Sequence, residues 1–183
     1  MSDSNAQFVE TFQGWLRGLP EDAEALTALL EDEAIPLDAR EFVAGGLNYL
    51  FKSLDIVPDG IDQLGYLDDC FVIRVAASLA LDEGADEGGM DALETLGRLS
   101  NETDSLEQFL GDDLERLMTY VRTQKRGAAR GRSVTDILTD EETRAEFIQD
   151  VRAFAQGYRA PSRGEDETTL VKFRGFLDKK LPK

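Results

Sequence analysis

Five aspartates fall within fifteen residues of the chain, and no lysine or arginine lies between Lys52 and Arg74 to neutralise them. Carboxylate oxygens are the ligands that hard cations such as Mg²⁺, Mn²⁺ and Ca²⁺ prefer, so this pattern is a candidate divalent-cation site. A bound cation there would support metal-assisted hydrolysis. The candidate ligands are Asp55, Asp59, Asp62, Asp68 and Asp69.

The spacing of these aspartates does not match a calcium-binding EF-hand loop. A loop that begins at Asp55 would place Asp59 and Gly60 correctly, at its fifth and sixth positions. Its third and twelfth positions would be Val57 and Tyr66, where the motif requires an oxygen ligand and a bidentate glutamate. A cation site is therefore an alternative interpretation of the cluster.

The same carboxylates also have a structural interpretation. In the turn formed by Pro58, Asp59 and Gly60, proline fixes one dihedral angle and glycine accepts a positive φ. Asp68 and Asp69 fall in the first turn of a predicted helix, where the helix dipole favours negative charge by about 0.3–1 kcal/mol each. We therefore expect the five aspartates to structure the loop. The residues expected to set its geometry are Pro58, Gly60, Gly65 and Tyr66.

Two stretches of this region form a specific pattern: Leu-Asp-Ile-Val-Pro-Asp-Gly-Ile at 54–61 and Leu-Gly-Tyr-Leu-Asp-Asp at 64–69. Together with their flanking helices, over roughly residues 42–81, they resemble the YkvA-like family, domain of unknown function 1232. The usual family pattern is Asp-x-Ile-Pro-Asp-x-Ile-Pro, from which this chain departs at Val57 and Asp62. The resemblance implies a small helical domain found in bacterial proteins, and it implies no activity.

Apolar residues recur at helical spacing along nearly the whole chain, and no strand pattern of useful length competes. Pro20 is expected to open a second helix, at the first position that proline favours. A single helix is expected over about 104–123, after a central apolar helix that ends at Leu81. The sequence thus predicts an all-α, compact multi-helix domain of about seven to nine helices. Its centre is the helix-loop-helix at 42–81, with an acidic Pro-Asp-Gly loop.

Charge divides the chain into two parts. Residues 1–123 hold 27 Asp and Glu against 7 Lys and Arg, whereas residues 124–183 hold 10 against 13. We expect an acidic helical body at 1–123, a basic Gly/Ala-rich linker at 124–132 and a C-terminal helical extension at 133–183. The extension begins with Ser-Val-Thr-Asp, which resembles a capping box with aspartate in place of glutamate. The candidate partner-binding cations of the linker are Lys125, Arg126, Arg130 and Arg132.

The composition excludes several classes of chemistry. The chain contains no histidine, so it lacks the Ser-His-Asp and Cys-His nucleophile pairs and any imidazole metal ligand. Its single cysteine, Cys70, lies among apolar residues and is expected to be an inert core residue. No apolar run approaches the length of about 18 residues that a membrane span requires, and no secretory signal is visible. We therefore expect a cytoplasmic protein.

These observations favour a non-enzymatic interaction or regulatory module that needs no cofactor. The acidic body would repel the phosphates of duplex nucleic acid, so the expected partner is another protein or a second copy of the chain. One alternative is a divalent-cation-dependent hydrolase that uses the aspartates at 55–69. A second alternative is a peripheral membrane adaptor whose last helix, at 168–181, contacts lipid.

Overall fold

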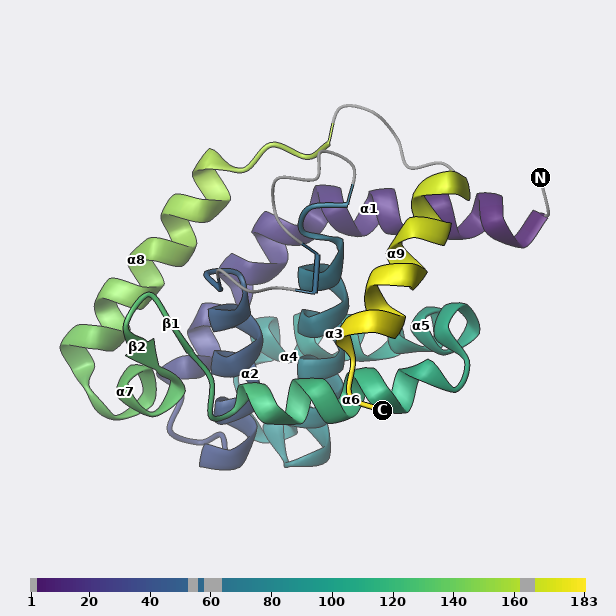
Figure 1. The fold of residues 1–183 in the computed structure, drawn as a ribbon. Coiled ribbons are helices and arrows are strands. Elements are labelled where there is room, and N and C mark those ends of the chain that lie inside the picture. The colour runs from purple at the N-terminus through teal and green to yellow at the C-terminus, as the bar shows by residue number, and fades with distance from the viewer. Residues whose placement is uncertain (1–2, 53–55, 58–63, 162–166) are drawn as a thin grey trace.

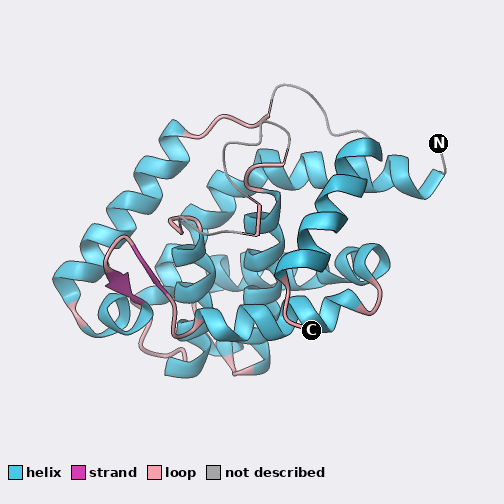
Figure 2. Cartoon of the chain, viewed as in Figure 1, coloured by secondary structure: helices cyan, strands magenta, loops and turns pink. Residues whose placement is uncertain are grey.

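The computed structural model describes residues 3–52, 56–57, 64–161 and 167–183. Helices form most of this part of the chain and pack around a hydrophobic core, which confirms the predicted all-α fold (Figures 1 and 2). The α-helices are α1 (Asp3–Leu26), α2 (Leu37–Tyr49), α3 (Leu67–Asp82), α4 (Met90–Asn101), α5 (Thr103–Leu110), α6 (Asp113–Gln124), α7 (Val134–Thr139), α8 (Glu141–Gly157) and α9 (Glu167–Lys180). The shorter elements are the 3-10 helices Thr27–Leu30 and Ala85–Glu87 and the paired strands β1 (Ala128–Ala129) and β2 (Arg132–Ser133).

Helix α3 lies at the centre of the fold, as the sequence predicted. Every residue from Leu67 to Ala77 is buried, because α3 is apolar around almost its whole circumference and must be covered on all sides. Helices α1, α2, α4 and α6 pack around it. The approach of α2 is especially close at Gly46, where an added Cβ would lie 2.8 Å from the Cβ of Ala76. Glycine therefore sets the spacing of the central helix pair.

An aromatic cluster joins helices that are distant in sequence. Phe12 of α1 lies edge-to-face with Phe71 of α3 at 5.0 Å and with Phe109 of α5 at 4.9 Å between ring centroids. Phe173 of α9 packs edge-to-face on Phe71 at 5.0 Å. Such pairs contribute about 0.5–1.5 kcal/mol each beyond the area they bury. The last helix is thus packed into the core of the acidic body.

Two predicted helix boundaries are wrong. The helix expected to open at Pro20 is instead part of α1, which continues through the proline. The buried residues Leu19 and Ala23 lie on either side of Pro20, and their packing offsets the cost of an interior proline. The single helix expected over 104–123 is divided into α5 and α6 at Gly111, whose φ of 57° glycine adopts without strain.

The basic stretch at 124–132 forms the end of α6 and a short β-hairpin. Its turn contains Arg130 and Gly131, both with positive φ, as in the two-residue turns that suit hairpins. Gln124 is buried, and its backbone lies against Gly45 of α2, where an added Cβ would approach within 2.9 Å. Beyond the hairpin, α7 packs on α2 and α8 packs on α1. Whether residues 1–123 fold independently of the rest stays a prediction.

Candidate functional site

A buried hydrogen-bond network lies where α2 ends and α3 begins. Asp68 is 0% exposed, and its Oδ2 accepts hydrogen bonds from the Tyr49 hydroxyl at 2.7 Å and from the Val57 amide at 3.1 Å. The Tyr49 hydroxyl in turn accepts a hydrogen bond from the Ile56 amide at 2.8 Å. Asp68 occupies the first turn of α3, as predicted. One carboxylate and one hydroxyl therefore fix residues 56–57 to both helices of the central pair.

The electrostatics of this network suit a structural role. Burial, together with the neighbouring carboxylate of Asp68, raises the pKa of Tyr49 far above its ordinary value. The hydroxyl therefore stays protonated and donates a hydrogen bond to the Asp68 carboxylate. Hydrogen bonds to a charged acceptor contribute about 1.5–3 kcal/mol each. The negative charge also lies at the positive end of the α3 dipole.

The other described residues of the acidic segment are packed against the fold. Asp69 and Gly65 are buried. Tyr66 precedes α3 with a φ of 69°, an uncommon conformation for a bulky residue. Its ring packs edge-to-face on those of Phe154 and Tyr158, at 5.5 and 5.4 Å between ring centroids. Phe154 lies in α8, and Tyr158 is the residue that directly follows this helix. This aromatic contact holds the segment against α8.

The predicted cation site cannot be assembled from the described residues alone. Among them, no three His, Cys, Asp or Glu side chains gather as a metal site requires. The cation-binding role of the aspartates therefore stays a prediction. The predicted loop residues that lie outside the described part of the chain are Asp55, Pro58, Asp59, Gly60 and Asp62.

A second buried polar cluster, centred on Arg74, was missed by the sequence analysis. Arg74 is 1% exposed, and its guanidinium lies 4.0 Å from the centre of the Trp15 ring. Its Nε and Nη2 contact Glu102 Oε2 at 2.7 and 2.6 Å, and its Nη1 donates to the Cys70 carbonyl at 3.0 Å. The sequence does contain a sign of this cluster, because Arg74 is the one charge between Cys70 and Leu81, and a charge buried in an apolar helix must be paired.

Asp22 and Arg98 complete the Arg74 cluster. Asp22 Oδ2 lies 3.7 Å from Arg74 Nη2, and Arg98 bonds to Asp22 and to Glu102. Burial raises the pKa of the Asp22 carboxyl, and the charges of Arg98 and Arg74 oppose this shift. The cluster joins α1, α3 and the α4–α5 junction. Its cations and carboxylates are paired with one another, as in a structural ion-pair network.

The predicted partner-binding cations are largely engaged within the molecule. Lys125 Nζ lies 2.9 Å from Asp38 and 3.1 Å from Glu41. Arg132 pairs with Asp150 at 2.6 Å, and Arg130 lies over a core phenylalanine ring. Arg126 is exposed and forms no ion pair within the described residues. Lys125 and Arg126 line an open, polar groove of about 980 Å³ together with Asp38, Glu41, Thr119, Arg122, Thr123 and Thr135.

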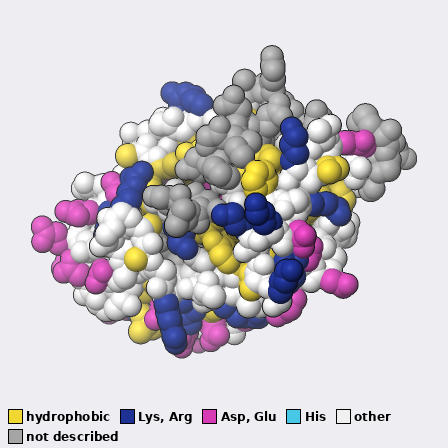
Figure 3. Space-filling view, in the orientation of Figure 1, with side chains coloured by type: hydrophobic (Ala, Val, Ile, Leu, Met, Phe, Trp, Pro, Cys, Tyr) yellow, Lys and Arg dark blue, Asp and Glu magenta, His cyan; other side chains and the backbone are white. Residues whose placement is uncertain are grey.

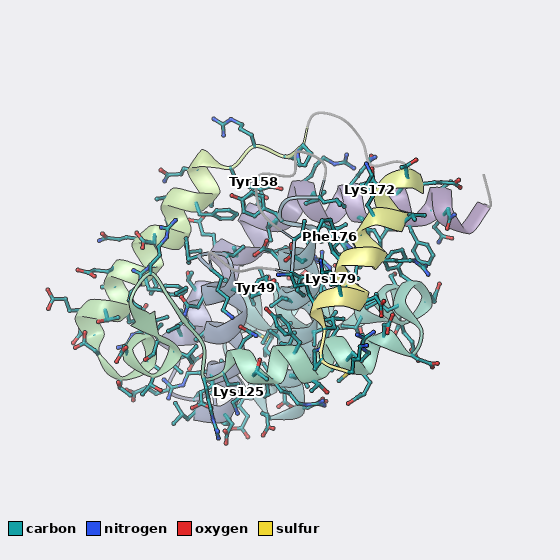
Figure 4. The ribbon with its side chains drawn as sticks, viewed as in Figure 1. Tyr49, Lys125, Tyr158, Lys172, Phe176 and Lys179 are labelled. Atoms are coloured by element: carbon teal, nitrogen blue, oxygen red, sulfur yellow. The ribbon has the colours of Figure 1, made fainter. Side chains whose placement is uncertain are left out.

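The lysines of α9 are in a different situation. Lys172, Lys179 and Lys180 are exposed, and none of them forms an ion pair with any residue that the structure describes. The half-buried ring of Phe176 lies beside them on the same helix (Figure 4). Asp178, the nearest acidic neighbour in sequence, is engaged by Arg116 of α6 at 3.3 Å. The sequence alone pointed to the cations at 125–132. It could not show which cations form ion pairs, because those pairs join helices that are distant in sequence.

Comparison with known proteins identifies no relative of this chain. No family model, curated protein or solved structure matches the chain. The resemblance of residues 42–81 to the YkvA-like family therefore stays a prediction, and any proposal about function depends on the geometry of the chain itself.

Proposed function

We propose that this chain is a non-enzymatic, cytoplasmic interaction module of the YkvA-like kind, whose binding surface is the exposed side of α9. We name this surface the α9 basic face. Its residues are Val171, Lys172, Phe176, Lys179 and Lys180. The observation that supports the proposal is that three lysines lack ion-pair partners among the described residues, although the chain carries a net charge of −17.

Electrostatics explain why such a surface favours binding. Interactions between exposed charges are largely screened beyond about 10 Å at 0.1 M salt, so the acidic residues of distant helices do little to neutralise these lysines. A local positive surface attracts and orients a negatively charged partner. Figure 3 shows Lys and Arg side chains, with apolar side chains between them, over the middle of the face that carries α9. The α9 basic face thus combines charge with some apolar area.

Packing favours a protein partner over a lipid bilayer. The apolar residues of α9 that would have to enter a bilayer, Leu170, Phe173 and Leu177, are buried in the core. Within the described ranges, no helix has the length and apolar character needed to cross a membrane. The α9 basic face could therefore attract lipid only through its charges and the side chains of Val171 and Phe176. The hydrolase alternative depends on the aspartates at 55–69.

The proposal predicts that partners are captured through α9 in the cell. A photo-crosslinking amino acid at position 176 should give discrete protein adducts, because Phe176 lies at the edge of the proposed surface. The same group at Ala145, an exposed position on α8, is the matched control and should not give these adducts. Reversing the charge at Lys172, Lys179 and Lys180 should abolish the adducts at 176. Adducts that persist after charge reversal, or that form equally at 145, would refute the proposal.

A further inference from the structure

A second charged surface lies where α2 begins and α3 ends, at the lower edge of the view in Figure 1, whereas α9 lies at its upper right. Contacts bring two segments together there. The Asp32 carboxylate accepts a hydrogen bond from the Gly89 amide at 3.1 Å, and Pro36 lies close to Gly84. We name this surface the acidic end. Its carboxylates are Glu31, Asp32, Glu33, Asp38, Asp82, Glu83, Asp86 and Glu87.

Exposed apolar side chains accompany both charged surfaces. Leu37 lies on the acidic end and is 52% exposed, and Met90, three residues after Glu87, is 82% exposed. Val171 on the α9 basic face is 69% exposed. These three are the large hydrophobic side chains exposed in the described part of the chain. A single exposed hydrophobic residue is ordinary, but these lie on two surfaces of opposite charge.

We infer that the α9 basic face of one copy binds the acidic end of a second copy. This inference rests on the proposed function and names its partner. Contact between the two surfaces would bring carboxylates to the three lysines, which form no ion pair among the described residues, and would cover Val171 with Leu37 and Met90. An anionic lipid surface would satisfy the lysines but would leave Leu37 and Met90 exposed. Because the two surfaces differ, the contact is heterologous, and copies associate head to tail.

The contact is expected to be weak and sensitive to salt. Exposed ion pairs contribute little to affinity, and the apolar area offered by three side chains is small. The net charge of −17 makes two copies repel each other at long range, but salt screens this repulsion beyond about 8 Å at physiological ionic strength. Association therefore depends on short-range complementarity of the two surfaces. Sedimentation velocity should show concentration-dependent association at about 50 mM salt that disappears at about 500 mM.

A charge swap tests the pairing of the two surfaces directly. One variant carries Lys172→Glu, Lys179→Glu and Lys180→Glu, and the other carries Asp82→Lys, Asp86→Lys and Glu87→Lys. Each variant alone should associate less than the wild type, because one variant has lost the positive charge of the α9 basic face and the other has lost most of the negative charge of the acidic end. An equal mixture should associate again, because the unaltered α9 basic face of the second variant then meets the unaltered acidic end of the first.

A control variant separates surface pairing from net charge. Glu141→Lys, Glu142→Lys and Glu146→Lys change the total charge by the same amount as the acidic-end variant but lie on α8. This variant should associate at least as well as the wild type at the same salt concentration. Loss of association in the control, or a mixture of the two swap variants that stays monomeric, would overturn the inference.

The oligomeric state also distinguishes this inference from the proposed function. A wild-type chain that is monomeric at about 100 µM and low salt rejects the second copy as partner. If the crosslinker at position 176 then captures a different protein, the proposed function stands without self-association. If it captures nothing and the chain instead binds vesicles of anionic phospholipid, both the inference and the proposed function are rejected.

Discussion

Replacing Asp68 with alanine is expected to lower the free energy of unfolding by about 3–5 kcal/mol. The substitution removes the acceptor for the Tyr49 hydroxyl and for the Val57 amide in a site with no access to water. Unpaired buried donors lose their hydrogen bonds without gaining a bond to solvent. Urea denaturation measures the loss, and it should be the same with and without divalent metal.

Two further variants make the Asp68 experiment specific. Asp104→Ala, at an exposed position in the first turn of α5, should change stability by no more than about 1 kcal/mol, the usual size of a helix-dipole interaction. Tyr49→Phe removes only the hydroxyl and should show a coupling with Asp68→Ala of about 0.5–3 kcal/mol in a double-mutant cycle. A loss below 1 kcal/mol for Asp68→Ala, or zero coupling, would show that the network does not hold the central helices together.

Replacing Arg74 with alanine is expected to cost about 3–5 kcal/mol, the range observed when one partner of a buried ion pair is removed. The change leaves Asp22 and Glu102 without their buried cation and removes the guanidinium from the Trp15 ring. Arg152→Ala, at an exposed position on α8, is the matched control and should be nearly neutral. Denaturation midpoints of the two variants give the comparison.

The Arg74 variant should also respond to pH in a defined direction. Arg74 opposes the rise in pKa that burial imposes on Asp22, so its removal raises the pKa of this carboxyl further. A carboxyl whose pKa is raised in the folded state destabilises the fold at pH values above that pKa and ceases to do so once it is protonated. The stability deficit of Arg74→Ala relative to the wild type should therefore shrink as the pH falls from 7 toward the ordinary pKa of aspartate. A deficit that grows on acidification would contradict this assignment of Asp22.

The local pattern of the sequence was enough to predict the elements that depend on neighbouring residues. The apolar run after Tyr66 predicted a buried central helix, and α3 is buried along most of its length. The Ser-Val-Thr-Asp pattern predicted a capping box, and the side chains of Ser133 and Asp136 each accept a hydrogen bond from the backbone amide of the other. Both features depend on contacts within a few residues.

Features that depend on long-range packing could not be predicted in the same way. The sequence places Arg74 in an apolar helix but gives no means of finding Asp22 and Glu102, which come from other helices. The continuation of α1 through Pro20 is fixed by tertiary packing, which overrides the local preference of proline. Likewise, only the folded chain distinguishes a paired lysine such as Lys125 from Lys179, which forms no ion pair with the residues that the structure describes.

We expect the aspartates of the acidic segment to serve the fold and not to hold a catalytic cation. Thermal unfolding of the wild type in chelator and in millimolar Mg²⁺, Mn²⁺ or Ca²⁺ tests this expectation most directly. Asp59→Ala is the matched variant, because Asp59 is a candidate ligand in the cation interpretation. We expect the melting temperature of each protein to be the same with metal and with chelator. A cation held by the native state would stabilise the wild type by about 2.7 kcal/mol at a hundredfold excess over its Kd. Such a shift, seen in the wild type and absent from Asp59→Ala, would contradict the account and favour a cation-dependent hydrolase.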